Sequence, residues 1–356
     1  MKGLRKYLTP FAPDQSGVSS VLYDMGGITI ICDAGGCAGN VCGFDEPRWF
    51  ETKSAIFSAG LRDMDAIMGR DEHLVKKLSL AIKDTKPKFA AIVGTPVPSV
   101  IGTDYYALLK ITERKVDVPV IAIASTGMSL YDKGAEATYC TLMEKFLKLD
   151  DENHKNTAYV LGANPLDTSY KKPYDMYREY YLKKGFEKVV VIGDENTLEE
   201  LNHFSVNGEV FVVAPSGAKA ARYMEKRYGI SYVIENEPGI EHIISKLSDV
   251  KIEDKKILVI EQQVSANSLR KYLLEKNAKS VTVATWFMQL DALKEEGDIN
   301  LKEEDECQAL LNNNEFDIII ADSMHQKMIK EFKGIFVPIN QFSISGKLVE
   351  DERDSY

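Results

Sequence analysis

The sequence predicts an α/β fold made of three doubly wound domains whose sheets are mainly parallel. Short runs of apolar and β-branched residues recur along the whole chain, without polar alternation, as is typical of strands buried on both faces of a parallel sheet. Amphipathic segments of helical period separate these runs. With 356 residues, the chain is long enough for two or three domains.

The predicted elements alternate in the order that right-handed strand–helix–strand crossovers produce, which makes each domain Rossmann-like. The predicted strands are Ile28–Ile31, Phe89–Val93, Val118–Ala124, Thr157–Leu161, Val189–Ile192, Val210–Val213, Ile257–Ile260, Val281–Ala284 and Phe316–Ile320. The predicted helices include Asp71–Asp84, Leu130–Leu149, Ser216–Tyr228 and Lys302–Leu311. Several strands end in small or polar residues just before a helix, where ligands bind in open α/β sheets.

Two polar stretches mark the expected domain boundaries, Lys171–Tyr174 and Asp249–Lys256. We therefore expect a first α/β domain over residues 1–170, a second over residues 171–250 and a third over residues 251–356.

Composition and missing motifs exclude several classes of function. The net charge of −10 argues against nucleic acid or an anionic membrane surface as the main partner. Five cysteines are too few for a disulfide framework, and neither a secretory signal nor an apolar run long enough to span a membrane is present. These features indicate a cytoplasmic protein with reduced thiols. The chain also lacks the glycine-rich phosphate-binding motifs of nucleoside triphosphate and dinucleotide sites.

The densest chemical motif is the glycine-rich stretch Ile31–Trp49. It spaces three thiols as C-x4-C-x4-C, at Cys32, Cys37 and Cys42. Thiolates suit iron–sulfur clusters or zinc, and Asp33 or Asp45 could supply an oxygen ligand. The spacing matches neither a ferredoxin run nor a zinc ribbon, so small buried thiols near a tight turn are an equal alternative.

Six segments together resemble the component 1 family of nitrogenase, from about Pro10 to Leu348. The superfamily also contains cofactor-assembly scaffolds and the catalytic subunits of dark-operative protochlorophyllide reductase. The matching segments are Gly17–Cys37, Ser54–Leu78, Val93–Asp104, Ser125–Thr138, Val212–Val233 and Phe316–Ile339. The resemblance implies the fold of that family, a nitrogenase component 1-like arrangement of three α/β domains.

The departures from the family pattern limit what the resemblance implies. Cys37 matches a family cluster ligand, whereas Pro96 stands where a later cysteine ligand falls. The stretches that correspond to the ligands of the nitrogenase cofactor, Val212–Gly217 and Val337–Gly346, contain neither cysteine nor histidine. A nitrogenase-type molybdenum cofactor is therefore not expected, nor is reduction of dinitrogen.

The resemblance implies an oxidoreductase component that holds a [4Fe–4S] cluster near Cys32, Cys37 and Cys42, in a homodimer or in a heterodimer with a sister chain. An ATP-dependent, iron-protein-like reductase would supply electrons to a small-molecule substrate. The substrate would lie between the domains, near Thr95, Ser125, Ser216 and Ser323. The alternatives are a non-catalytic scaffold or carrier for cluster or cofactor assembly, and a cluster-free binding protein.

Overall fold

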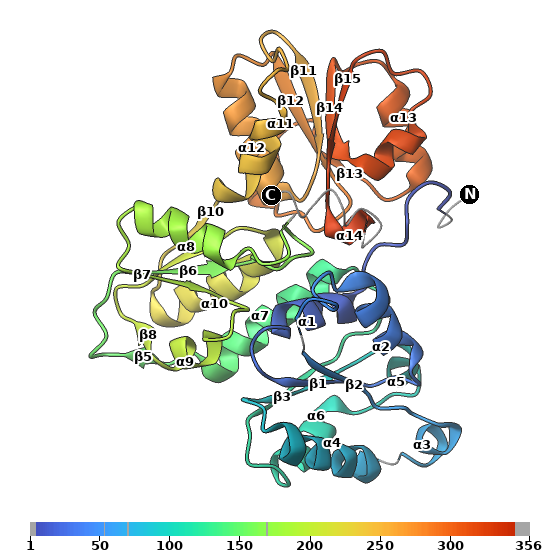
Figure 1. Cartoon of the computed structure of the whole chain (residues 1–356), viewed down its shortest axis with the longest axis vertical. Coiled ribbons are helices and arrows are strands. Elements are labelled where there is room, and N and C mark those ends of the chain that lie inside the picture. The colour runs from blue at the N-terminus through green and yellow to red at the C-terminus, as the bar shows by residue number, and fades with distance from the viewer. Residues whose placement is uncertain (1–4, 53, 70, 169, 346–356) are drawn as a thin grey trace.

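The computed structural model describes residues 5–345 except residues 53, 70 and 169. The end of the predicted third domain, residues 346–356, lies outside this part of the chain. Three parallel sheets follow one another along the chain, each with helices on both faces (Figure 1). This confirms the predicted α/β class. No helix in the described ranges is long and apolar enough to cross a membrane.

The first unit has a four-stranded sheet in the order β2-β1-β3-β4. Its strands are β1 (Ile28–Ile31), β2 (Ala55–Ser58), β3 (Ala90–Val93) and β4 (Val120–Ile123). Its helices are α1 (Asp14–Leu22), α2 (Gly36–Asn40), the π-helix η1 (Val41–Asp45), α3 (Asp63–Met68), α4 (Asp71–Thr85), α5 (Pro96–Val100), α6 (Tyr105–Glu113) and α7 (Tyr131–Phe146). Apolar side chains of α4 and α6 cover one face of the sheet, while those of α1 and α7 cover the other.

The second unit has a four-stranded sheet in the order β10-β9-β6-β7. Its elements are β6 (Thr157–Leu161), α8 (Tyr174–Lys183), β7 (Lys188–Val191), α9 (Thr197–Asn202), β9 (Glu209–Val212), η2 (Pro215–Gly217), α10 (Ala218–Tyr228) and β10 (Tyr232–Ile234). A separate two-strand pair joins β5 (Leu149–Asp150) to β8 (Phe204–Ser205). Because β6 is a central strand of this sheet, the unit begins before the sequence boundary at residue 170.

The third unit has a five-stranded sheet in the order β13-β12-β11-β14-β15. Its strands are β11 (Lys256–Ile260), β12 (Ser280–Thr285), β13 (Ile299–Asn300), β14 (Ile318–Asp322) and β15 (Ile335–Ile339). Its helices are η3 (Pro238–Ile240), α11 (Glu241–Lys246), α12 (Gln263–Glu275), η4 (Asp291–Leu293), α13 (Glu304–Asn312), η5 (Ser323–Met328) and α14 (Phe342–Ser345). Edge strands β13 and β15 were not predicted, because β13 has only two residues and β15 contains Pro338, which is atypical of a strand inside a sheet.

Helix α7 joins the first two units into one core. Its buried side chains belong to an apolar cluster that also contains residues from the first sheet and from the second. The helix crosses α1 at very close range, because a Cβ on Gly17 would lie 1.9 Å from the Tyr131 carbonyl oxygen. A Cβ on Gly134 would lie 1.8 Å from the Asp14 carbonyl oxygen. The two glycines therefore set the distance between these helices.

Candidate functional site

All three sheets have a point where the strand order reverses. The reversal falls between β1 and β3 in the first sheet, between β6 and β9 in the second, and between β11 and β14 in the third. A crevice opens beyond the carboxyl ends of parallel strands at such a point, and ligands of open α/β proteins bind there. The residues that directly follow these strands are therefore the candidates for function.

Cys32 lies at the end of β1, inside the protein core. Its side chain is part of the apolar cluster of the first unit, and the residue is only 1% exposed. Its N–H donates to the Val93 carbonyl (2.8 Å), and its carbonyl accepts the Thr95 hydroxyl (2.6 Å). Burial, followed by the charge of Asp33, raises the pKa of the Cys32 thiol to about 12, which favours the protonated form.

Cys37 and Cys42 are both half-buried on the short helical segment α2–η1. The Thr95 hydroxyl is close enough to hydrogen-bond the Cys37 thiol, and it partly offsets the rise in pKa that burial causes. Thr95 directly precedes Pro96, where the resemblance places a second family ligand. The fold thus brings Cys37 to the β1–β3 crevice, next to that position.

The two aspartates proposed as oxygen ligands already accept hydrogen bonds. Asp33 accepts the Ala38 N–H (2.7 Å) and the Ser58 hydroxyl (2.5 Å), which anchors the start of α2. Asp45 Oδ2 accepts the Ser16 hydroxyl at 2.6 Å. Within the described ranges, no three His, Cys, Asp or Glu side chains converge as a metal site would require. A cluster bound at the cysteine segment therefore needs ligands in addition to the side chains that this segment brings together.

Three glycines, Gly36, Gly39 and Gly43, leave the backbone uncovered at the surface beside Cys37 and Cys42. A Cβ added at Gly36, Gly39 or Gly43 would meet nothing within 4 Å, so packing inside the chain does not require glycine there. Phe44, which directly follows Gly43, is 66% exposed, and Phe50, seven residues after Gly43, is 76% exposed. Bare backbone and exposed aromatic rings are typical of a surface that another chain covers.

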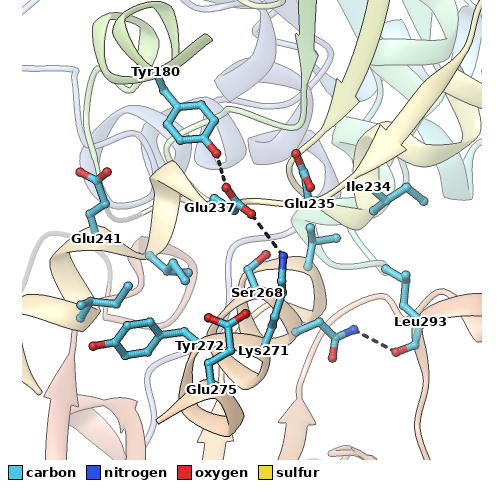
Figure 2. A pocket seen from close by; sticks show the side chains of 14 residues that line it. Tyr180, Ile234, Glu235, Glu237, Glu241, Ser268, Lys271, Tyr272, Glu275 and Leu293 are labelled. Atoms are coloured by element: carbon cyan, nitrogen blue, oxygen red, sulfur yellow. Dashed lines mark hydrogen bonds and ion pairs between the residues drawn. The ribbon is translucent and has the colours of Figure 1, made fainter. Parts of the chain in front are cut away.

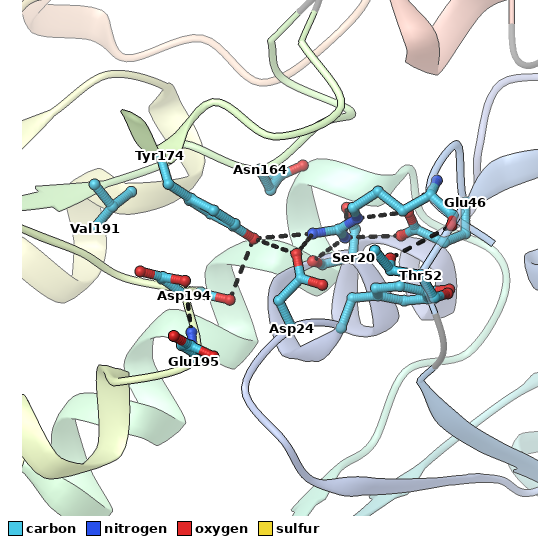
Figure 3. Close-up of polar contacts among 12 residues, drawn as sticks. Ser20, Asp24, Glu46, Thr52, Asn164, Tyr174, Val191, Asp194 and Glu195 are labelled. Carbon is cyan, nitrogen blue, oxygen red and sulfur yellow. Dashed lines mark hydrogen bonds and ion pairs between the residues drawn. The ribbon is translucent and has the colours of Figure 1, made fainter. Parts of the chain in front are cut away.

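A buried charge network anchors the segment that follows the cysteines (Figure 3). Arg48 is fully buried, and its Nε and Nη2 donate to the Glu46 carboxylate at 2.7 and 2.9 Å. Its Nη1 donates to Asp24 at 2.8 Å and to the Tyr174 hydroxyl at 2.9 Å. Its Nη2 also donates to the Ser20 carbonyl of α1 at 2.7 Å, so the guanidinium ties the cysteine segment to α1 and to α8 of the second unit.

The four predicted cleft hydroxyls do not form one cluster of contacts. Thr95 and Ser125 lie at the ends of neighbouring strands, where Ser125 donates to the Gly94 carbonyl at 2.7 Å. Ser216 is buried in the second unit and donates to Asp167 at 3.0 Å. Ser323 is half-buried at the start of η5. A role of these hydroxyls in substrate binding stays a prediction.

Three buried carboxyl groups that we did not predict lie where the second and third units meet. Asp167 accepts hydrogen bonds from the Tyr131 hydroxyl (2.7 Å) and from Ser216. Glu261 directly follows β11, and one of its oxygens is buried without a hydrogen-bond partner in the described structure. Asp322 ends β14 and is close enough to repel Glu261. The sequence contains a signal for Glu261, because this acidic residue directly follows the predicted buried strand Ile257–Ile260.

Burial raises the pKa of Asp167 to about 7 and that of Glu261 to about 8, so the folded chain keeps protons that the unfolded chain loses. Stability must then fall as pH rises through this range. Burial lowers the pKa values of His242 and His325 to about 4, so between about pH 4 and 7 these two groups make stability rise with pH.

We expect the free energy of unfolding to fall by about 2 kcal/mol between pH 6.5 and 8.5, and Glu261→Gln to remove most of that slope. Urea titrations across this range, with the exposed Glu315→Gln as control, measure it. An unchanged slope in Glu261→Gln would show that this carboxyl already ionises below pH 6.5 in the folded chain.

Three α/β units, each with a strand-order reversal and the first with a cysteine segment beside it, define a multidomain α/β protein of the kind that binds ligands at the carboxyl ends of its strands. A family model for nitrogenase component 1 type oxidoreductases matches residues 16–251. The chain belongs to this family, as the resemblance implied.

Curated relatives and solved structures agree with that assignment. The nitrogenase iron-molybdenum cofactor biosynthesis protein NifE of Clostridium pasteurianum is 27% identical over 231 residues, which are 63% of this chain and 47% of that protein. The protein of the same name from Bradyrhizobium diazoefficiens is 27% identical over 54% of this chain and 36% of its own length. The chain thus covers half or less of these relatives.

A solved structure of nitrogenase Cp1 at pH 6.5 aligns with a TM-score of 0.68 at 12% identity, over 96% of this chain and 87% of that one. This similarity confirms the nitrogenase component 1-like fold across all three units.

Proposed function

We propose that this chain is a scaffold for cofactor assembly that holds an iron–sulfur cluster between two protein chains. The proposal rests on the half-buried positions of Cys37 and Cys42 beside the bare glycine surface. The curated relatives, named as cofactor biosynthesis proteins, favour the scaffold over an enzyme.

Two thiolates from each of two chains would complete the four ligands of a [4Fe–4S] cluster. When bound, such a cluster supplies one-electron transfer or an attachment point for a cofactor precursor. The chain's own residues fit part of this task, because Cys37 and Cys42 reach the surface and Gly36, Gly39 and Gly43 allow close approach. Cys32 fits less well, because ligation would require its thiolate to form inside an apolar core.

A nitrogenase-type molybdenum cofactor does not fit the second unit. The stretch that would supply its cysteine carries Ser216, whose hydroxyl is buried and bonded to Asp167. A hydroxyl in that position is a poor substitute for a soft thiolate ligand.

Iron and acid-labile sulfide in protein purified without oxygen test the proposal. We expect about two irons per chain in a dimer, because a four-iron cluster would be shared. Cys37→Ser and Cys42→Ser should each lose most of the iron, while Cys140→Ser, a half-buried thiol on α7, keeps it. Absence of iron after reconstitution, or full iron in Cys37→Ser, would contradict the proposal.

The glycine surface gives a second test that does not depend on metal analysis. We expect Gly39→Ala to stabilise the separate chain by about 0.5–1 kcal/mol, because alanine favours helix and its Cβ meets nothing. The same methyl group should weaken the dimer at least tenfold in sedimentation equilibrium. An equally strong dimer would place the interface elsewhere.

The second candidate is an oxidoreductase component, and the family to which the chain belongs favours it. A homodimer or heterodimer would then receive electrons from an ATP-dependent, iron-protein-like reductase and pass them to a small molecule between the domains. The buried Asp167 and Glu261 would be close to such a substrate and able to hold protons near neutral pH. Reductase-dependent turnover of a bound small molecule would favour this candidate over the scaffold.

A further inference from the structure

The third unit is joined to the rest of the protein by contacts of two kinds. The chain passes from the first unit to the second and from the second to the third. In the part of the chain that the structure describes, the third unit therefore meets the first only through noncovalent contacts. Residues 5–12, which lie just before α1, pack on the third unit, and we refer to them as the latch (Figure 1).

A buried carboxylate of the third unit anchors the backbone of the latch. Glu304, at the start of α13, is 8% exposed. Its carboxylate accepts the N–H groups of three consecutive latch residues, Lys6, Tyr7 and Leu8, at 2.6, 2.9 and 2.8 Å. Hydrogen bonds to a charged acceptor are stronger than those between neutral groups. Three of them on one side chain hold this stretch of backbone against α13.

Apolar side chains of the latch complete the core of the third unit. Leu8, Phe11 and Ala12 belong to the same apolar cluster as side chains of β11, β14 and α13. The Phe11 ring lies 5.3 Å from the Phe287 ring, and the Arg5 guanidinium lies 3.4 Å from the centre of the Phe11 ring. One side of the third unit is thus covered by residues that precede the first unit in the sequence.

Direct contacts lead from the latch to the buried carboxyl groups where the second and third units meet. The Phe287 ring packs against Phe11 and also against Tyr131, whose ring centre is 5.0 Å away. The Tyr131 hydroxyl donates to Asp167 at 2.7 Å. Asp167 and Glu261 are only 3% and 5% exposed, so a small molecule reaches them only if the units move apart.

The boundary between the second and third units, away from the latch, has the features of a hinge. The chain enters the third unit just after β10, where Asn236 is buried, accepts the Tyr177 hydroxyl at 2.9 Å and donates to Ser265 at 2.7 Å. These contacts form a pivot between α8 and α12. A cavity of about 550 Å³, lined in part by Tyr180 and Glu237, lies beside the pivot (Figure 2). A pivot next to open space allows one unit to turn against the other.

We propose that the latch holds the third unit closed over the buried carboxyl groups, and that its release opens a path to Asp167 and Glu261. The third unit would turn about the segment after β10, and the Phe11, Phe287 and Tyr131 rings would separate. Opening of this kind is a local event that leaves each sheet folded. The latch contains none of the cysteines, so its action can be tested whether or not a cluster is bound.

Carbodiimide labelling of the whole chain with glycine ethyl ester, followed by mass spectrometry, measures whether Glu261 can be reached. We expect Glu304→Ala to label Glu261 at least fivefold faster than the wild-type chain does, because three backbone anchors are lost. Glu304→Gln keeps one acceptor oxygen and should give an intermediate rate. The matched control Glu315→Ala removes an exposed carboxylate of the same unit and should leave the rate unchanged.

Amide hydrogen exchange on the same variants separates opening from unfolding. Exchange should become faster in residues 5–12 and at Met288, whose N–H donates to Asp132 of α7 at 2.5 Å, and should stay slow in β3. Equal labelling of Glu261 in Glu304→Ala and in the wild-type chain would overturn the proposal. So would an equal acceleration of exchange in β3, because loss of the latch would then unfold the chain instead of opening it.

Discussion

Arg48→Ala is expected to lower the free energy of unfolding by about 3–5 kcal/mol, because it leaves the buried Glu46 carboxylate and Asp24 without their cation. The loss should be largest where the two units meet, since Arg48 also donates to Tyr174. Urea denaturation measures the change, and hydrogen exchange in α1 and α8 locates it. Arg48→Lys should recover only part of the stability, because an ammonium group cannot reproduce the forked contacts.

Arg178→Ala is the matched control for this prediction. Arg178 pairs with Asp175 and Asp194 near the same boundary, but its side chain is 32% exposed. An exposed ion pair of this kind contributes at most about 1 kcal/mol. If Arg48→Ala cost no more than Arg178→Ala, the buried network would not hold the cysteine segment in place.

The second large effect is expected from Gly134→Ala, which should destabilise the chain by about 3 kcal/mol. Its new methyl group would lie 1.8 Å from the Asp14 carbonyl oxygen, and this backbone contact cannot relax by turning a side chain. Helix α7 would have to move away from α1 and disturb the apolar core that both units share. Thermal and urea denaturation measure the loss.

Gly39→Ala makes the same chemical change on a helix where nothing lies within 4 Å of the new methyl group. A monomer that is stabilised in Gly39→Ala and destabilised in Gly134→Ala would separate the steric effect from helix propensity. Equal stability changes in the two variants would show that α1 and α7 are not in close contact.

The sequence predicted the central strands well. Predicted strand Ile28–Ile31 is β1, and Thr157–Leu161 is β6, each with the same bounds. Their continuous apolar character arises because both faces are covered by helices. Edge strands such as β2 (Ala55–Ser58) were not predicted. An edge strand is less buried than a central strand, so its run of apolar residues is less distinct, and Phe57 of β2 is exposed.

The site could be predicted only in part. The cysteine spacing and the family resemblance led to Cys37. The rule that ligands bind at the carboxyl ends of parallel strands led to Thr95. Neither approach indicated that Arg48 is buried, because the sequence around a charged residue does not show which distant residues will pair with it. Its partners Asp24 and Tyr174 are 24 and 126 residues away in the chain.

The sequence by itself determined the α/β class, the family and the cysteine segment, because hydrophobic periodicity and motif order are local properties of the chain. Only the tertiary structure decided that Cys32 points into the core while Cys37 and Cys42 reach the surface, and that Asp167 and Asp322 each lie close enough to Glu261 to repel its charge. Exposure and proximity depend on how helices and sheets pack across long separations in sequence. That packing fixes which thiols can bind a ligand and which carboxyl groups keep a proton.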